Sequence, residues 1–167
     1  AIEIDPNNIL ANFNLANLFK RLSDHKNSEI YYKKTIEINP NYLPAYNNIM
    51  DLYDKSNQNE KLRDLINSAE KIFLNDQVIK SFKAKLLYKN KSYKEVVNLL
   101  ENTEFLPEQM VQKQASYEVL AKSYDKVGDY GRAFKLFQML NDIMDQGKDQ
   151  TVDKKIYIKT TKDRLNF

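Results

Sequence analysis

Apolar residues recur every three or four positions along most of the chain, with polar residues between them. This spacing places the apolar side chains on one face of an α-helix. The segments between the periodic stretches are short and polar, which favours antiparallel pairing of neighbouring helices. The pattern predicts four helix pairs, with helices at 9–22 and 25–38, 43–55 and 58–74, 77–89 and 93–102, and 109–127 and 130–145.

Local signals at the expected helix starts agree with this pattern. Asp24 and Asp129 precede periodic stretches and can accept hydrogen bonds from first-turn N–H groups as N-caps. The segment SYKE, at 92–95, has the spacing of a capping box. Pro44 falls in a first helical turn, where a backbone N–H is not needed.

The chain also repeats itself. The segment AIEIDPNN at 1–8 returns as TIEINPNY at 35–42, an offset of 34 residues. The same offset relates a second set of small and large apolar residues in unchanged order: Ala11, Leu15, Ala16 and Phe19 to Ala45, Ile49, Met50 and Tyr53. A fixed period of this length indicates one helical unit that is stacked several times.

One segment carries the most specific signature. SYEVLAKSYDKVGDYGRAFKLF, at 116–137, resembles a tetratricopeptide (TPR) unit through Tyr117, Leu120, Ala121, Tyr124, Gly128, Tyr130, Ala133 and Phe137. This resemblance and the 34-residue period imply an all-α fold, a right-handed α-solenoid of about four TPR helix pairs with a C-terminal capping helix. Small residues such as Ala16 and Ala121 would let the two helices of a pair approach closely.

The resemblance divides the chain into six segments: 1–8, the end of a preceding truncated repeat; 9–42, 43–76, 77–110 and 111–147, four TPR units; and 148–167, a capping helix. The third unit is degenerate, because Lys83 stands where a large apolar residue is usual and Leu74 where proline is usual. About three extra residues surround Pro107 before the fourth unit. We expect the chain to be a piece of a longer protein, since IEIDP closes a repeat rather than opening one.

Composition narrows the possible functions. The net charge is only +3, and no cysteine is present, which excludes disulfides and thiolate zinc sites and fits a cytoplasmic location. No segment approaches the roughly 20 apolar residues of a membrane span, so we expect no membrane insertion. The mild charge and the 34-residue period make nucleic-acid binding unlikely. The basic residues Lys154, Lys155, Lys159, Lys162 and Arg164 are expected on a solvated face.

The sequence carries no recognisable catalytic apparatus. It has no Gly-rich phosphate loop, no Gly-x-Ser-x-Gly and no paired-His metal motif. The lone His25 is expected to pack in the turn between the first two helices. Asp51 and Asp54 are interpreted as an exposed helix face rather than an acid/base pair. We predict no catalytic residue, no metal and no cofactor, and no enzymatic activity for this chain.

In a TPR solenoid the first helix of each pair lines the concave groove. The resemblance therefore implies a peptide-binding site at Phe13, Asn14, Asn17, Lys20, Arg21, Asn47, Asn48, Asp51, Lys55, Phe82, Lys85, Lys89 and Lys122. An asparagine side chain has both a donor and an acceptor, so it can pair with a peptide backbone whatever side chains the peptide carries.

Two TPR precedents bear on this groove. The segments ANFNLANLFK and AYNNIMDLYD look like the repeats of O-GlcNAc transferase, which holds peptide backbone on a ladder of asparagines. Asn14 and Asn48 occupy the ladder position, and Phe82 and Val119 replace it later.

The chaperone-type carboxylate clamp is the other precedent. Asn17 and Asn48 match its asparagines, but Phe13, Val78 and Phe82 stand where its cations belong. We therefore do not expect this clamp.

The leading functional hypothesis is a non-catalytic scaffold that binds an extended peptide or a partner protein in its groove. The alternative is the recognition module of a larger enzyme. LAKSYDKVGDYGRAFKLFQMLNDIM with the lysine-rich segment after it is similar to the last repeat of bacterial TPR-sulfotransferase proteins, which would place a catalytic domain beyond residue 167. Exposed apolar residues at the ends, such as Ile2 and Ile4, would also permit self-association.

Overall fold

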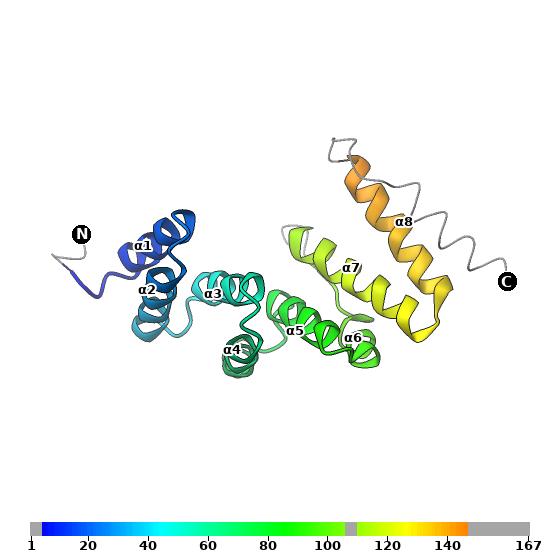
Figure 1. Ribbon diagram of the computed structural model, residues 1–167, viewed down its shortest axis with the longest axis horizontal. Coiled ribbons are helices and arrows are strands. Elements are labelled where there is room, and N and C mark those ends of the chain that lie inside the picture. The colour runs from blue at the N-terminus through cyan, green and yellow to red at the C-terminus, as the bar shows by residue number, and fades with distance from the viewer. Residues whose placement is uncertain (1–4, 106–109, 147–167) are drawn as a thin grey trace. The chain divides into compact units, whose positions relative to one another are not determined.

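A computed structural model describes residues 5–105 and 110–146 (Figure 1). The regular elements in these ranges are all α-helices: α1 Ile9–Arg21, α2 His25–Ile38, α3 Leu43–Lys55, α4 Asn59–Ile72, α5 Gln77–Lys89, α6 Tyr93–Leu100, α7 Met110–Val127 and α8 Tyr130–Gln146. The predicted all-α fold is confirmed, and the predicted helix ends differ from the observed ones by two residues at most. The capping helix predicted for 148–167 lies outside the described residues.

The chain divides into two compact units, Ala1–Phe82 and Lys83–Phe167, with the boundary inside α5. In the first unit α1 packs against α2, α2 against α3, and α3 against α4. In the second unit α6 packs against α7, and α7 against α8. Consecutive helices are therefore neighbours in space within each unit, as short connections require.

The first helix pair shows why small residues recur in the pattern. Ala16 of α1 and Tyr32 of α2 are fully buried. A methyl group at position 16 leaves room for α2 to approach, and aromatic rings fill the space on both sides. Phe19 stacks on Tyr31 with 5.6 Å between ring centroids, and Phe13 lies 5.9 Å from Tyr32.

A recurring backbone turn connects the two helices of each pair. One residue in each of these turns has positive φ: Ser23 (59°), Asn57 (55°), Lys91 (62°) and Gly128 (87°). The next residue donates its N–H to a carbonyl five positions earlier, at 2.9–3.0 Å, and so ends the first helix. The four turns follow one another at intervals of 34, 34 and 37 residues, so the period of the sequence is also a period of the backbone.

The second unit has its own apolar core. It is formed by residues of α5, α6, α7 and α8: Ala84, Val96, Leu100, Leu120, Tyr124 and Ala133. Ala121 and Ala133 are fully buried, which again places small residues on α7 and α8 at close helix contacts.

The predicted helix starts are mostly correct. Asp24 Oδ1 accepts the N–H of Asn27 at 3.1 Å, Asp129 Oδ1 accepts the N–H of Arg132 at 3.0 Å, and Pro44 lies in the first turn of α3. The predicted capping box at 92–95 is wrong, because Ser92 is the N-cap of α6 but its side chain makes no capping hydrogen bond. The backbone starts this short helix without help from the side chain.

Candidate functional site

The first helices of two consecutive pairs, α1 and α3, are joined by polar side chains. Asn48 Nδ2 donates to Asn17 Oδ1 at 3.2 Å, and Lys20 Nζ donates to Asp51 Oδ2 at 2.8 Å. Both contacts join residues 31 positions apart. The structure thus brings together predicted site residues from two helices, and we call Asn14, Asn17, Lys20, Arg21, Asn48, Asp51 and Lys55 the α1–α3 polar face.

The asparagines of this face have different surroundings. Asn17 Oδ1 accepts two hydrogen bonds, from Tyr32 OH at 2.6 Å and from Asn48 Nδ2 at 3.2 Å. Its acceptor is therefore fully used within the protein. Asn48 keeps its carbonyl oxygen and a second N–H for another partner, and Asn14 is exposed three residues before Asn17.

The charged residues of the face are centred on Asp51. Its Oδ2 atom lies 2.8 Å from Lys20 Nζ and 3.0 Å from Lys55 Nζ. Burial alone would raise the pKa of the Asp51 carboxyl, but hydrogen bonds from both lysines outweigh it and lower the pKa below its ordinary value. The expectation that Asp51 lies on a merely exposed helix face was wrong, because it is an interhelical ion-pair residue with only 27% of its side chain exposed.

Other predicted site residues are less accessible. Phe13 is half-buried and packs edge-on against Tyr42 at 5.2 Å. Asn47 is half-buried, and its Oδ1 atom is buried without a hydrogen-bond partner. Phe82 is only 8% exposed, so little of its ring can contact another molecule.

Three predicted site residues belong to the second unit. Lys85 is half-buried and Lys89 is exposed, both on α5. Lys122 of α7 forms an ion pair with Glu118, one helical turn before it. These three lysines are therefore surface features of the second unit, and Lys122 already pairs with the carboxylate of Glu118.

The sequence analysis missed a contact between successive helix pairs. Tyr53 OH donates to Glu29 Oε1 at 2.9 Å, and Lys61 Nζ lies 3.1 Å from Glu29 Oε2. The same ammonium lies 5.4 Å from the centre of the Tyr53 ring. Burial, and then the hydrogen bond to Glu29, raise the pKa of the Tyr53 hydroxyl well above its ordinary value, so it stays a donor.

The second unit contains the same combination of groups. Tyr124 OH donates to Glu101 Oε1 at 3.2 Å, Arg132 forms an ion pair with Glu101, and the guanidinium lies 4.5 Å from the Tyr124 ring centre. We call each set of tyrosine, glutamate and cation a latch. A tyrosine near the end of a first helix, followed by a cation eight positions later, is the sequence signal that could have identified both.

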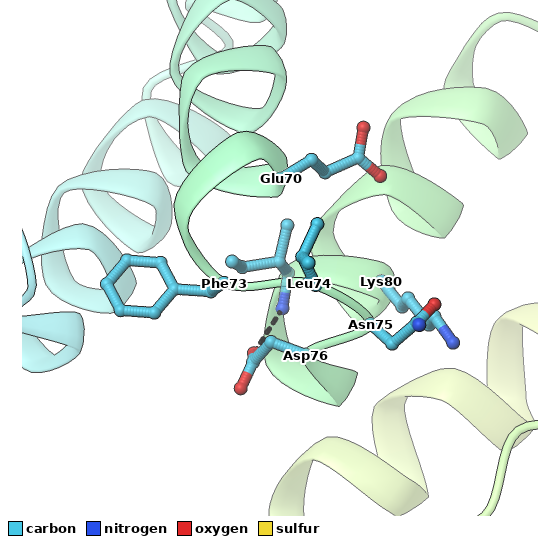
Figure 2. A pocket seen from close by; sticks show the side chains of 7 residues that line it. Glu70, Phe73, Leu74, Asn75, Asp76 and Lys80 are labelled. Carbon is cyan, nitrogen blue, oxygen red and sulfur yellow. Dashed lines mark hydrogen bonds between the residues drawn. The ribbon is translucent and has the colours of Figure 1, made fainter.

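A small pocket lies at the turn between α4 and α5 (Figure 2). It has a volume of about 180 Å³, and Glu70, Phe73, Leu74, Asn75, Asp76, Ile79 and Lys80 line it. Small-molecule sites usually occupy roughly 300 Å³ or more. Asp76 is already used as a cap, since its Oδ1 accepts the N–H groups of Val78 and Ile79 at 2.9 and 3.0 Å. This pocket is therefore smaller than the usual small-molecule site.

A metal site and a membrane-spanning helix receive no support from the described ranges. Within them no group of three or more His, Cys, Asp and Glu residues is placed to hold a metal ion. None of the described helices has both the length and the apolar character needed to cross a membrane.

His25 is exposed at the first position of α2, so the expectation that it packs into the turn was wrong.

Comparison with known proteins identifies the fold. Neither protein-family models nor curated proteins match the sequence. Among solved structures, MamA superposes with a TM-score of 0.64 at 11% identity, over 81% of this chain and 73% of MamA. PilF of Pseudomonas aeruginosa gives 0.64 at 12% identity, over 81% of this chain and 60% of PilF. PilW, a type IV pilus biogenesis factor, gives 0.64 at 17% identity, over 86% of this chain and 66% of PilW.

The fold is that of the tetratricopeptide repeat. The chain spans less than two thirds of the length of the PilF and PilW structures. Because the sequence identities are only 11–17%, these matches show a shared fold and say nothing about a shared function. The α1–α3 polar face is thus a surface of two consecutive first helices in a TPR fold.

Proposed function

We propose that this chain is a non-catalytic scaffold that binds an extended peptide or a partner protein on the first helices of its TPR pairs. The observation that carries the proposal is the α1–α3 polar face. On it, Asn14 is exposed, and Asn48 keeps an unused acceptor beside its bond to Asn17. An asparagine side chain can pair with both the N–H and the C=O of a peptide backbone.

The α1–α3 polar face also carries charged side chains. Arg21 and Lys55 are exposed, while Asp51 holds Lys20 and Lys55 in place. One carboxylate between two ammonium groups leaves the cluster with a net positive charge, to which Arg21 adds. A bound segment therefore gains from an acidic side chain near the C-terminal end of α1, in addition to backbone pairing at the asparagines.

The alternative proposal makes this scaffold the recognition module of a larger enzyme, with a sulfotransferase domain beyond residue 167. None of the three structures compared above is described as a sulfotransferase. The parent reading frame tests this alternative directly. A downstream Gly-rich loop for a phosphosulfate donor would support it, and a frame that ends without one would reject it. We also propose a cytoplasmic location and self-association through the chain ends.

A peptide array probed with the full chain tests the scaffold proposal. Peptides that bind are then measured against a variant with Asn14→Ala and Asn48→Ala. Each lost amide hydrogen bond should weaken binding roughly 2- to 10-fold. The matched control is Asn67→Ala, because Asn67 is an exposed asparagine on α4, outside the face. Equal affinities of the double variant and the control would remove the asparagines from the site, and an array without any bound peptide would reject peptide binding.

A further inference from the structure

The α1–α3 polar face has a direction. The contact between Lys20 and Asp51 lies three residues further along both helices than the contact between Asn17 and Asn48. The helices α1 and α3 therefore run side by side in the same direction, and a residue of α1 lies opposite the residue 31 positions later. The amides lie midway along the two helices, so the two ends of the face can be compared.

Apolar side chains gather where the two helices begin. Leu10 is 60% exposed and precedes Asn14 by one helical turn, so it lies on the same side of α1 as the amides. Phe13 packs edge-on against Tyr42, with 5.2 Å between ring centroids, and the register of the helices places it opposite the exposed Pro44. We call Leu10, Phe13, Tyr42 and Pro44 the apolar end. Only Phe13 among them was predicted as a site residue.

Cations gather where the two helices finish. Arg21 is exposed, the side chain of Lys55 is 72% exposed, and both Lys20 and Lys55 bond to Asp51. We call Lys20, Arg21 and Lys55 the basic end. The acidic residues of the two helices are Asp51 and Asp54, so three cations face two carboxylates and this end keeps a net positive charge.

The two ends are equally far apart on both helices. Leu10 and Arg21 are eleven positions apart on α1, and so are Pro44 and Lys55 on α3. A helix rises 1.5 Å per residue, so the ends are separated by about 16 Å. An extended peptide rises about 3.3 Å per residue and covers this distance in about five residues.

We propose that the α1–α3 polar face selects an extended peptide in which an apolar residue and an acidic residue are about five positions apart. The apolar side chain packs on the apolar end, and the carboxylate pairs with the basic end. Asn14 and Asn48, which lie between the two ends, bond to the backbone of the peptide. This specificity rests on the proposed peptide-binding function, to which it adds the side chains and the spacing of the ligand.

Pools of synthetic peptides test the spacing. Each peptide has about ten residues and blocked ends, so that no terminal carboxylate can replace the acidic side chain. One Leu and one Asp are fixed in each pool, in either order, and the other positions are random among uncharged residues. The pools differ in the separation of Leu and Asp, from about two to about eight positions. The immobilised full chain should retain most peptide at separations of about four to six.

Variants of the protein then assign the two ends. Leu10→Ser should weaken binding of a recovered peptide about 5-fold or more, and should have little effect once the leucine of that peptide is replaced by Ser. The matched control is Leu74→Ser, because Leu74 is 79% exposed and lies after α4, outside the face. The leucine of the peptide and Leu10 should thus depend on each other.

The basic end has a separate measurement. Arg21→Gln should weaken binding about 2- to 5-fold, and the effect should shrink near 0.5 M NaCl or when the Asp of the peptide is replaced by Asn. Its matched control is Arg63→Gln, because Arg63 is exposed on α4. The loss caused by Leu10→Ser should not shrink with salt.

The outcomes separate this specificity from peptide binding as such. Equal retention at all separations would overturn the specificity and leave peptide binding in place. Equal losses in the two face variants and their two controls would do the same. If no pool is retained, peptide binding itself is rejected and the specificity is rejected with it.

Discussion

Lys20 and Asp51 form an ion pair of 2.8 Å that joins the first helices of two consecutive TPR pairs. It lies one helical turn from the hydrogen bond between Asn17 and Asn48, and both contacts have the same sequence separation. Four of the residues predicted to contact a ligand, Asn17, Lys20, Asn48 and Asp51, therefore also join α1 to α3. The predicted ligand contacts and the observed repeat packing share this face, so the substitutions that test one must control for the other.

Replacing Asp51 by Asn should lower the free energy of unfolding by about 1 kcal/mol, because part of the side chain is exposed and water screens the pair. The loss should depend on pH. The folded-state pKa of Asp51 is below its ordinary value of 3.8, so its stabilisation is present above that pH and is lost as the pH falls through the folded-state pKa. Urea unfolding at neutral pH and near pH 3 measures this.

The control for the Asp51 experiment is a double-mutant cycle with Lys20→Met. If the ion pair carries the effect, the two substitutions together should cost less than the sum of their separate costs. Strict additivity would show that the pair contributes nothing to stability.

Removing the hydroxyl of Tyr53 tests the first latch. Tyr53→Phe keeps the buried ring but takes away the donor to Glu29, and hydrogen bonds to charged groups contribute about 1.5–3 kcal/mol. We expect urea unfolding to show a loss in this range. Tyr124→Phe should cost less, because its hydrogen bond to Glu101 is longer, at 3.2 Å, and Glu101 is exposed. A larger loss of stability in Tyr124→Phe than in Tyr53→Phe would contradict this prediction.

Stability should also fall at alkaline pH. Burial raises the pKa of Tyr32 from 10.0 to about 12, and the pKa of Tyr53 is raised as well. Groups whose folded-state pKa is raised stabilise the fold fully below the unfolded-state value and lose that contribution as pH rises through the folded-state value. Stability should therefore decline between pH 10 and 12, and Tyr53→Phe should decline less steeply. Thermal midpoints at stepped pH, read with tyrosinate absorbance, measure both; parallel curves for the two proteins would contradict the role of Tyr53.

Much of the fold could be predicted because its signals are local. Helical periodicity located every described helix, and Asp24 and Asp129 act as caps through residues only three positions away. Buried Ala16 and Ala121 likewise followed from the need of paired helices to approach closely. Such features depend on a few neighbouring residues, which a single sequence contains.

The site was less predictable because its geometry depends on contacts between repeats. Asn14 and Asn48 occupy equivalent sequence positions, but only Asn48 has Asn17 of a preceding first helix beside it. Asp51 has the spacing of an exposed residue and becomes an ion-pair partner only when Lys20 approaches from α1. A 34-residue period makes two repeats equivalent in sequence. The contacts of equivalent residues still differ, because they depend on which repeats lie beside each one.

The close approach of α1 and α2 can be tested with a larger side chain. Ala16→Leu adds volume where no space is exposed and should cost about 1–3 kcal/mol. Ala11→Leu is the control, because Ala11 is on the same helix but only half-buried. Its cost in urea unfolding should be clearly smaller. A neutral Ala16→Leu would mean that the helices of this pair do not meet at residue 16.

The turn before α6 offers a stabilising substitution. Lys91 has a φ of 62°, a left-handed conformation that costs a residue with a side chain about 1 kcal/mol and costs glycine almost nothing. Gly128 already occupies the equivalent turn of the next pair, with a φ of 87°. Lys91→Gly should therefore raise the free energy of unfolding by up to about 1 kcal/mol. The matched control is Lys94→Gly, an exposed lysine three positions later inside α6, which should lower it by about 1 kcal/mol. Urea unfolding of both variants gives the comparison, and a loss of stability in Lys91→Gly would show that the lysine side chain contributes more than the turn geometry costs.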